Sequence, residues 1–144
     1  MAASTVDLFL TDPAVKNEWQ TFLTSLGITN FSAKEVQQID FTIGIYEGDR
    51  LVATGSAAGN VLKYIGVCNQ DVTNGARFNQ IVSELTTRLF RRGIFHLMVF
   101  TKLKYSQSFQ HVGFTELTHS AVAALLETGS PTVQDYLQSV PRRR

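Results

Sequence analysis

The sequence predicts an α/β (α+β) domain in which helices flank a mixed central sheet. Between residues 40 and 67, three segments with apolar residues at every second or nearly every position are separated by turns at 47–50 and 59–60, which predicts an antiparallel meander. Residues 61–101 then give an extended segment, a glycine turn, an amphipathic stretch and an apolar run. That order predicts one right-handed parallel β-α-β crossover.

The N-terminal part carries one strand and two helices. Residues 5–10 can form a strand, and Asp12 has the chemistry of a helix cap. Gly27 is a plausible end of that helix. Ser32 and Glu35 have the spacing of a capping box, which predicts a short second helix. The first helix is supported by apolar residues at helical spacing: Val15, Trp19, Phe22, Leu23 and Leu26.

The meander and the crossover follow in order. Residues 41–46 alternate, which predicts a strand with one better-buried face, and strands follow at 51–56 and 61–67. Residues 94–101 are almost continuously apolar, as expected of a strand buried on both faces. The helix predicted over 75–92 carries one apolar stripe: Phe78, Ile81, Val82, Leu85 and Leu89.

The remaining residues predict a short helix over 103–112 that ends at Gly113. Closing strands are expected at 114–117 and 121–127, with a terminal amphipathic helix over 131–140. The 144 residues, 44% of them hydrophobic and 17% charged, predict a single domain covering residues 1–144.

Composition excludes several classes of function. A formal net charge of +1 and a basic cluster confined to Arg142–Arg144 give no basis for nucleic-acid binding. No apolar run is long enough to span a membrane, so no membrane association is expected. The N-terminus has no signal-peptide pattern, and the single cysteine, Cys68, suits a reducing compartment. We therefore expect a cytoplasmic protein.

The element order resembles the GNAT superfamily of acyl-CoA-dependent N-acetyltransferases. Three segments over about residues 40–140 resemble more specifically the N-terminal acetyltransferase-like domain of citrate lyase ligase: FTIGIYEGDRLVATGSAAGNVLKYIGV, TKLKYSQSFQHVGF and VQDYL. Residues 53–56 and 100–102 are the most specific pieces. The H-x-G-H signature of the ligase's nucleotidyltransferase domain has only a near match at 111–114, so that domain is absent and adenylylation is not expected.

The resemblance implies direct transfer of acetyl from acetyl-CoA, the cosubstrate, to an amine acceptor. The acceptor, a small molecule or a peptide, is not specified by the sequence. The alternative is a non-catalytic module that binds an acyl-CoA or a partner, such as an accessory of citrate lyase maturation. Relatives of this fold often pair through their last strands, so a homodimer is a further expectation.

The resemblance also implies coenzyme-binding residues. The main chain of Ile65 and Val67 would bind the pantetheine arm, with the Val67 N–H facing the thioester oxygen. The family's pyrophosphate loop, Q/R-x-x-G-x-G/A, aligns with a segment that departs from it at the first, fourth and sixth positions: Thr73, Asn74, Gly75, Ala76, Arg77 and Phe78. Free amides and the dipole at a helix start suit an anion. The alternative is a plain helix start with a surface arginine.

No catalytic residue is assigned from the sequence. Tyr105 stands where relatives carry an asparagine, and Phe109 stands where many carry a tyrosine that acts as general acid. Phe109 cannot donate a proton, and Tyr105 could replace it only if its hydroxyl reached the sulfur. Asp40 and Glu47 are candidate general bases, with solvated strand-end charges as the alternative.

The remaining reactive side chains have structural interpretations. His96 interrupts an apolar strand and is expected to be a hydrogen-bonded core residue, while His119 lies in a predicted turn. Cys68 ends the strand beside the expected thioester, and lone cysteines of this kind usually serve packing. No three residues have metal-ligand spacing, so no metal is expected.

Overall fold

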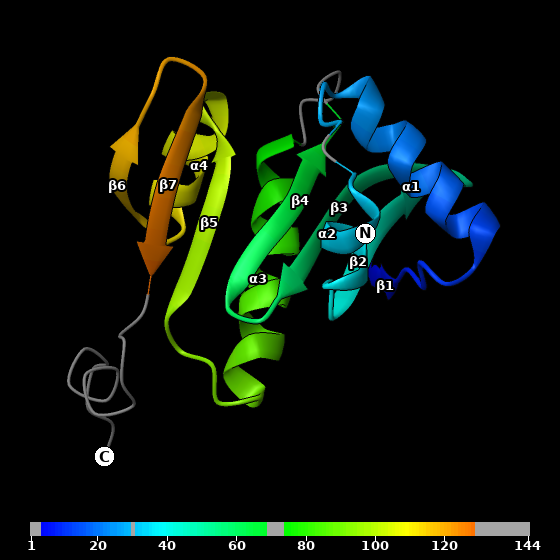
Figure 1. The fold of residues 1–144 in the computed structure, drawn as a ribbon, viewed down its shortest axis with the longest axis horizontal. Helices are drawn as coiled ribbons and strands as arrows, with labels where there is room; N and C mark the ends of the chain where they lie inside the picture. Colours follow the sequence, from blue (N-terminus) through cyan, green and yellow to red (C-terminus); the bar gives the residue numbers. More distant parts are fainter. Residues whose placement is uncertain (1–3, 30, 69–73, 129–144) are drawn as a thin grey trace.

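The computed structural model describes residues 4–29, 31–68 and 74–128, and these form one seven-stranded sheet with helices on both faces (Figure 1). The strand order is β1-β2-β3-β4-β5-β7-β6. Within these residues every neighbouring pair of strands is antiparallel except β4 and β5, which run parallel. The predicted mixed sheet, with its meander and its parallel crossover, is confirmed.

Most bounds of the elements lie within a few residues of the predicted ones, but the first strand, expected over residues 5–10, ends at Asp7. The strands are β1 (Thr5–Asp7), β2 (Phe41–Glu47), β3 (Arg50–Ala58), β4 (Val61–Val67), β5 (Leu97–Lys102), β6 (Thr115–His119) and β7 (Ala123–Thr128). The helices are α1 (Pro13–Ser25), α2 (Ala33–Gln37), α3 (Asn74–Arg91) and α4 (Ser106–His111), with a 3-10 turn, η1 (Leu103–Tyr105), before α4. The predicted terminal helix, residues 131–140, lies outside the described residues.

Side-chain caps fix the starts of the first two helices. Asp12 Oδ1 accepts a hydrogen bond from the Ala14 N–H at 3.0 Å, which satisfies an amide that α1 itself leaves free. Ser32 Oγ accepts one from the Glu35 N–H at 3.1 Å at the start of α2. Gly27 follows α1 with a φ of +80°, a conformation that glycine adopts readily. These three predicted boundaries are confirmed.

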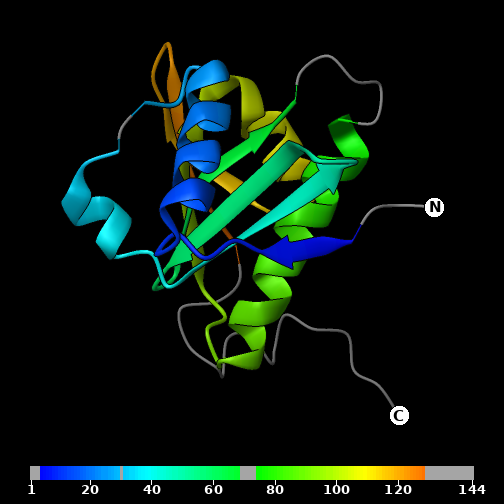
Figure 2. The ribbon, with the colours of Figure 1, turned by 90° about the vertical axis from the view of Figure 1, so that its right-hand side faces the viewer.

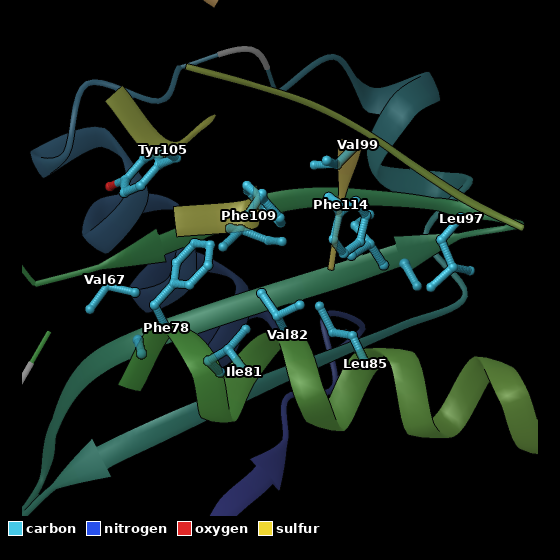
Figure 3. Packing of buried hydrophobic residues seen from close by; sticks show 14 of the residues in the cluster. Val67, Phe78, Ile81, Val82, Leu85, Leu97, Val99, Tyr105, Phe109 and Phe114 are labelled. Carbon is cyan, nitrogen blue, oxygen red and sulfur yellow. The ribbon is translucent and has the colours of Figure 1, made fainter. Parts of the chain in front are cut away.

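Two apolar cores lie on opposite faces of the sheet. Figure 2 shows the helices that cover these faces. α1 and α2 cover one face, where Trp19 and Leu23 are fully buried. α3 and α4 cover the other face, and their side chains form the larger core with the inner residues of β2 to β5 and β7 (Figure 3). β3 passes through the middle so tightly that a Cβ on Gly55 would lie 2.6 Å from Ile81.

The prediction that β2 has one better-buried face is wrong. Thr42, Ile43, Gly44 and Ile45 are all buried, because β2 lies between the two cores. The polar member of this run is satisfied: Thr42 Oγ1 and Ser56 Oγ share a hydrogen bond of 2.8 Å across the β2–β3 pair. A short hydroxyl pair of this kind makes a buried threonine compatible with a core position.

The prediction that residues 94–101 form a strand buried on both faces is also wrong. The strand begins at Leu97, and Leu97 and Val99 face the core at 0% and 1% exposure. Phe100, on the opposite face, is 70% exposed. Among the described residues no helix covers that face of β5 and β7, since α1 and α2 end over the meander (Figure 1). The apolar run in the sequence therefore did not show whether one face of the strand or both faces are covered.

Candidate functional site

The candidate site is an opening between β4 and β5. These parallel strands pair at only two positions, Val61 with Met98 and Leu62 with Val99. Beyond this point the strands diverge toward their C-terminal ends (Figure 1). A cavity of about 530 Å³ lies here, lined by both strands, the segment after α1, α2 and the turn between β6 and β7.

A β-bulge in β4 separates the two strands. Thr54 of β3 pairs with Gly66, and Ser56 pairs with Lys63, so β4 has one residue more than β3 over this stretch. Tyr64 lies inside the bulge with a φ of +54°. That left-handed conformation costs a residue other than glycine about 1–2 kcal/mol. Bulges bend a strand and end its pairing, and backbone strain of this kind is concentrated at functional sites.

The amide of Val67 faces the opening. The neighbouring Cys68 N–H donates to the Val52 carbonyl on β3 at 2.9 Å. Successive amides along a strand point to opposite edges, so the Val67 N–H points away from β3 and toward β5. β5 has no pairing with β4 at this level, so no strand hydrogen bond to β5 engages this N–H.

The hydroxyl of Tyr105 lies beside this amide. Tyr105 is 9% exposed, and its ring stacks on Phe78 with centroids 6.1 Å apart (Figure 3). Its buried hydroxyl faces the Val67 N–H but makes a full hydrogen bond with neither this amide nor any other described group. Burial raises the pKa of Tyr105, and the Val67 amide opposes that rise. A phenol with a raised pKa stays protonated at neutral pH, so it can donate a proton.

The start of α3 lies next to the opening, and some of its residues are exposed while others are paired or buried. Gly75 and Ala76 are exposed, and a Cβ on Gly75 would meet no atom within 4 Å. No acidic residue lies in the first turn of the helix. The Arg77 guanidinium forms an ion pair with the Glu47 carboxylate, and the Phe78 ring is 4% exposed in the core. Gly75 and Ala76 therefore offer open amides, while Phe78 can contribute only its backbone.

These residues fit a coenzyme A thioester. An orphaned, buried tyrosine hydroxyl and an amide that points away from β3 lie together at the C-terminal end of β4. The uncovered first turn of α3 leaves room for a diphosphate. Of the expected cofactor-binding residues, Ile65 lines the cavity, whereas Val67 is not among its lining residues. Thr73 lies outside the described residues, and Asn74 begins α3.

Sequence reasoning missed the opposite wall of the cavity. Glu35 and Tyr64 line it from α2 and β4, joined by a hydrogen bond of 3.1 Å from the Tyr64 hydroxyl to Glu35 Oε2. Lys63 and Lys102 also line the cavity. Glu35 was identified only as a helix-capping residue, because a capping box and a cavity-lining carboxylate have the same local sequence.

We predict that Tyr64 ionises only in strong alkali. Burial, followed by the contact with Glu35, raises its pKa from 10.0 to about 12. A raised folded-state pKa stabilises the fold below pH 10 and loses that contribution as the pH rises from about 10 to 12. Absorbance at 295 nm should therefore show the Tyr64→Phe protein losing amplitude from the step near pH 12. Loss from the step at pH 10 would contradict the prediction.

The two carboxylates proposed as general bases have other partners. Asp40 Oδ2 accepts a hydrogen bond of 2.7 Å from the Gly59 N–H in the turn that precedes β4, at the opposite end of β4 from the opening. Glu47 pairs with Arg77 and, at 4.0 Å, with Arg50. Neither carboxylate lines the cavity.

The histidines and the cysteine also lie away from the cavity lining. His96 Nε2 contacts Glu127 Oε1 at 2.8 Å, and His119 Nδ1 contacts Glu116 Oε2 at 2.9 Å. Cys68 is partly buried against the larger core. Over the described ranges, no group of three histidine, cysteine or acidic side chains is placed to hold a metal ion.

The chain is similar to a curated protein over most of its length. No protein-family model matches the chain. The citrate [pro-3S]-lyase ligase of Escherichia coli strain K12 is 25% identical over 122 residues, and the match covers 81% of this chain and 34% of the ligase. The chain thus spans about a third of the length of the ligase that it matches.

Solved structures match over nearly the whole fold. The aminoglycoside 6'-N-acetyltransferase of Enterococcus faecium superposes with a TM-score of 0.69 at 12% identity, over 97% of this chain and 99% of its own. A GCN5-related N-acetyltransferase of Rhodopseudomonas palustris gives 0.69 at 12% identity, over 90% and 97%. Escherichia coli ElaA gives 0.68 at 13% identity, over 88% and 99%.

The fold is that of the GCN5-related N-acetyltransferases. This confirms the architecture expected from the sequence, and at these identities the likeness establishes the GNAT fold alone. Among the described helices, none is both long and apolar enough to cross a bilayer.

Proposed function

We propose that this chain transfers the acetyl group of acetyl-CoA directly to an amine acceptor. One observation carries the proposal: the Val67 N–H and the Tyr105 hydroxyl lie together at an unpaired edge of β4, beside the open first turn of α3. Acetyl-CoA supplies an activated thioester. The residues of this chain bind it, orient it and handle charge and protons at the reacting end.

Val67 acts on the thioester oxygen. Its backbone N–H is fixed by the strand and points into the opening, so it donates to the oxygen as that atom gains negative charge during attack. A preorganised donor in this role contributes about 3 kcal/mol to the stability of the transition state. Because the donor belongs to the backbone, no side-chain substitution at Val67 removes it.

Tyr105 donates its proton to the departing thiolate. Its hydroxyl is next to the Val67 amide and has no competing full hydrogen bond within the described part of the chain. The raised pKa keeps this proton in place at neutral pH. Phe109, where many relatives have a tyrosine, is fully buried, so its position could not supply a donor to the opening.

The start of α3 holds the diphosphate. The exposed backbone amides at Gly75 and Ala76 and the positive end of an 18-residue helix attract the anion. Arg77 is paired with Glu47, so the cradle relies on amides more than on a guanidinium. We expect coenzyme binding to be weaker than an arginine-assisted site would give.

The test is titration calorimetry with coenzyme A and with acetyl-pantetheine, which lacks the diphosphate. We predict that Ala76→Glu weakens binding of coenzyme A about tenfold or more, because a carboxylate at the first turn repels the diphosphate. Binding of acetyl-pantetheine should be unchanged. The protein's stability should not fall, since an acidic residue near a helix N-terminus is favourable.

Ser83→Glu is the matched control. It adds the same charge to an exposed position two turns further along α3 and should leave both affinities unchanged. If coenzyme A does not bind at millimolar concentration to the unaltered protein, the acetyltransferase proposal is wrong.

A second function is favoured by the departures in the loop. With Ala76 at the central glycine position and Arg77 committed to Glu47, the chain could bind an acyl-CoA without turnover, as a sensor or as an accessory of citrate lyase maturation. A thiol-release assay over a panel of amines distinguishes the two. Binding without release under any amine would favour the non-catalytic module.

A further inference from the structure

The charges and apolar surface of the cavity define an acceptor chemistry. This inference rests on the proposed function and concerns the wall opposite α3, formed by α2, β4 and the end of β5. Among the cavity's lining residues, Glu35 is the one carboxylate, and Lys63 and Lys102 are the cations. The question is which of these charges a ligand can use.

Glu35 is held in place as an anion at the cavity wall. The Tyr64 hydroxyl donates to Glu35 Oε2 at 3.1 Å, and among the described residues no side chain hydrogen-bonds to Oε1. The Tyr64 ring packs against the rings of Trp19 and Phe31, with centroid separations of 5.3 Å and 5.5 Å. A positioned carboxylate with one oxygen engaged can receive an ammonium group on the other.

The two lysines differ in whether the ammonium group has a partner among the described residues. Lys102 Nζ donates to the Leu26 carbonyl at the end of α1 at 3.1 Å and so serves the fold. The ammonium group of Lys63 makes no hydrogen bond or ion pair with the described part of the chain. Lys63 is therefore the cation that an anionic group of a ligand would meet.

The remaining surface of the cavity is apolar. Phe100 and Val122 are 70% and 75% exposed, and both line the cavity. Exposed apolar side chains that gather at one cavity indicate a ligand-binding surface. An aliphatic or aromatic substituent of an acceptor would cover them.

The described lining contains no histidine that could remove a proton from the attacking amine. The α-amino group at the N-terminus of a peptide titrates near about 7.7–8.0, whereas a lysine-type amine titrates near about 10.4. A peptide N-terminal amine is thus largely neutral at mildly alkaline pH without a strong base. The absence of a histidine in this lining favours such an amine over an alkylamine.

We infer that the acceptor is an α-amine that also carries a carboxylate and an apolar side chain, as in an apolar amino acid or the free N-terminus of a short apolar peptide. The amine lies beside Glu35, the carboxylate meets Lys63, and the side chain covers Phe100. The bound ammonium first releases one proton to water. The neutral amine then attacks the thioester carbon, the carbon–sulfur bond breaks, and Tyr105 protonates the thiolate. The amide nitrogen loses its surplus proton, which returns through water to the Tyr105 phenolate.

The experiment compares leucine, leucyl-leucine and leucinamide, which keeps the amine and the side chain but lacks the charge. We expect kcat/KM for leucine or leucyl-leucine to exceed that for leucinamide about tenfold. The compound with the higher value identifies a free amino acid or a peptide N-terminus as the source. Lys63→Met should abolish this preference, whereas Glu35→Gln should lower kcat/KM for all three compounds.

Lys34→Met is the matched control, because Lys34 precedes Glu35 on α2 and does not line the cavity. It should change none of the three values. A second readout does not depend on turnover: calorimetry of leucine, or of leucyl-leucine if that is preferred, without coenzyme should give a Kd about tenfold higher for Lys63→Met than for the unaltered protein.

Equal use of leucine, leucyl-leucine and leucinamide, or a preference that survives Lys63→Met, overturns the inference while the acetyl transfer itself stands. Failure of coenzyme A to bind overturns the proposed function instead. In that case the titration of leucine or leucyl-leucine without coenzyme still tests the inference. An unchanged Kd for that ligand in Lys63→Met would contradict it.

Discussion

Phe109→Ala should lower the free energy of unfolding by about 3–5 kcal/mol, which is typical of removing a fully buried aromatic ring. Phe109 is 0% exposed and makes edge-to-face contacts with Phe78 at 4.8 Å and Phe114 at 5.2 Å (Figure 3). Its ring joins α4 to α3 and to the segment before β6. The substitution leaves a cavity and removes both aromatic contacts. Urea denaturation followed by circular dichroism measures the loss.

Phe100→Ala is the control for that experiment. It removes the same side chain from β5, but from a position that is 70% exposed, so the stability change should stay within about 1 kcal/mol. Equal losses in the two variants would mean that α4 does not pack on the sheet as described. A loss below 1 kcal/mol for Phe109→Ala would have the same meaning.

Tyr105→Phe should lower kcat about 100-fold, since proton donation by a positioned side chain typically contributes 10² to 10⁴. The variant should be as stable as the unaltered protein or slightly more so, because the buried hydroxyl makes no full hydrogen bond with a described group. The KM for acetyl-CoA should change little. Thiol release measures the rate, and denaturation measures the stability.

Tyr46→Phe provides the comparison for Tyr105→Phe. Tyr46 also has a raised pKa, about 12, but its hydroxyl donates to Glu18 at 2.6 Å on the α1 side of the sheet. This variant should keep full kcat and lose some stability. If Tyr105→Phe retained full kcat, the proton would have to come from elsewhere, and the assigned role would be wrong.

Measuring both kcat and stability distinguishes a catalytic role of Tyr105 from a structural one. A merely structural Tyr105 would show the reverse pattern, with stability lost and kcat kept. The raised pKa adds a pH signature: the rate supported by the Tyr105 proton should not decline from ionisation of this group until the pH exceeds 10, its ordinary value.

Local chemistry alone determined where the first two helices begin and where α1 ends. Asp12 and Ser32 cap helices because their side chains reach amides only two or three residues away, and Gly27 ends α1 because glycine adopts positive φ. The amphipathic stripe of α3 fixed which of its faces lies on the sheet. These features depend on near neighbours in the chain, and near neighbours are what a sequence displays.

Long-range packing decided the site. Tyr64 adopts its left-handed conformation although nothing in VLKYIGV marks a bulge, because the pairing with β3 and the aromatic contacts with Trp19 and Phe31 hold it there. The partner of Arg77, a carboxylate on β2, was equally invisible in the local sequence. Sequence position placed Phe109 where a proton donor often stands, but packing turned its ring into the core.

The sequence by itself determined the α/β architecture, the parallel crossover and the helix start beside it, since each follows from periodicity and from turn and cap residues. Only the tertiary structure decided that β4 leaves β5, that the Tyr105 hydroxyl meets the Val67 amide, and that Glu35 faces the same cavity as Phe100. The physical reason is distance along the chain: groups far apart in sequence become neighbours only when the sheet order and its bulge are set.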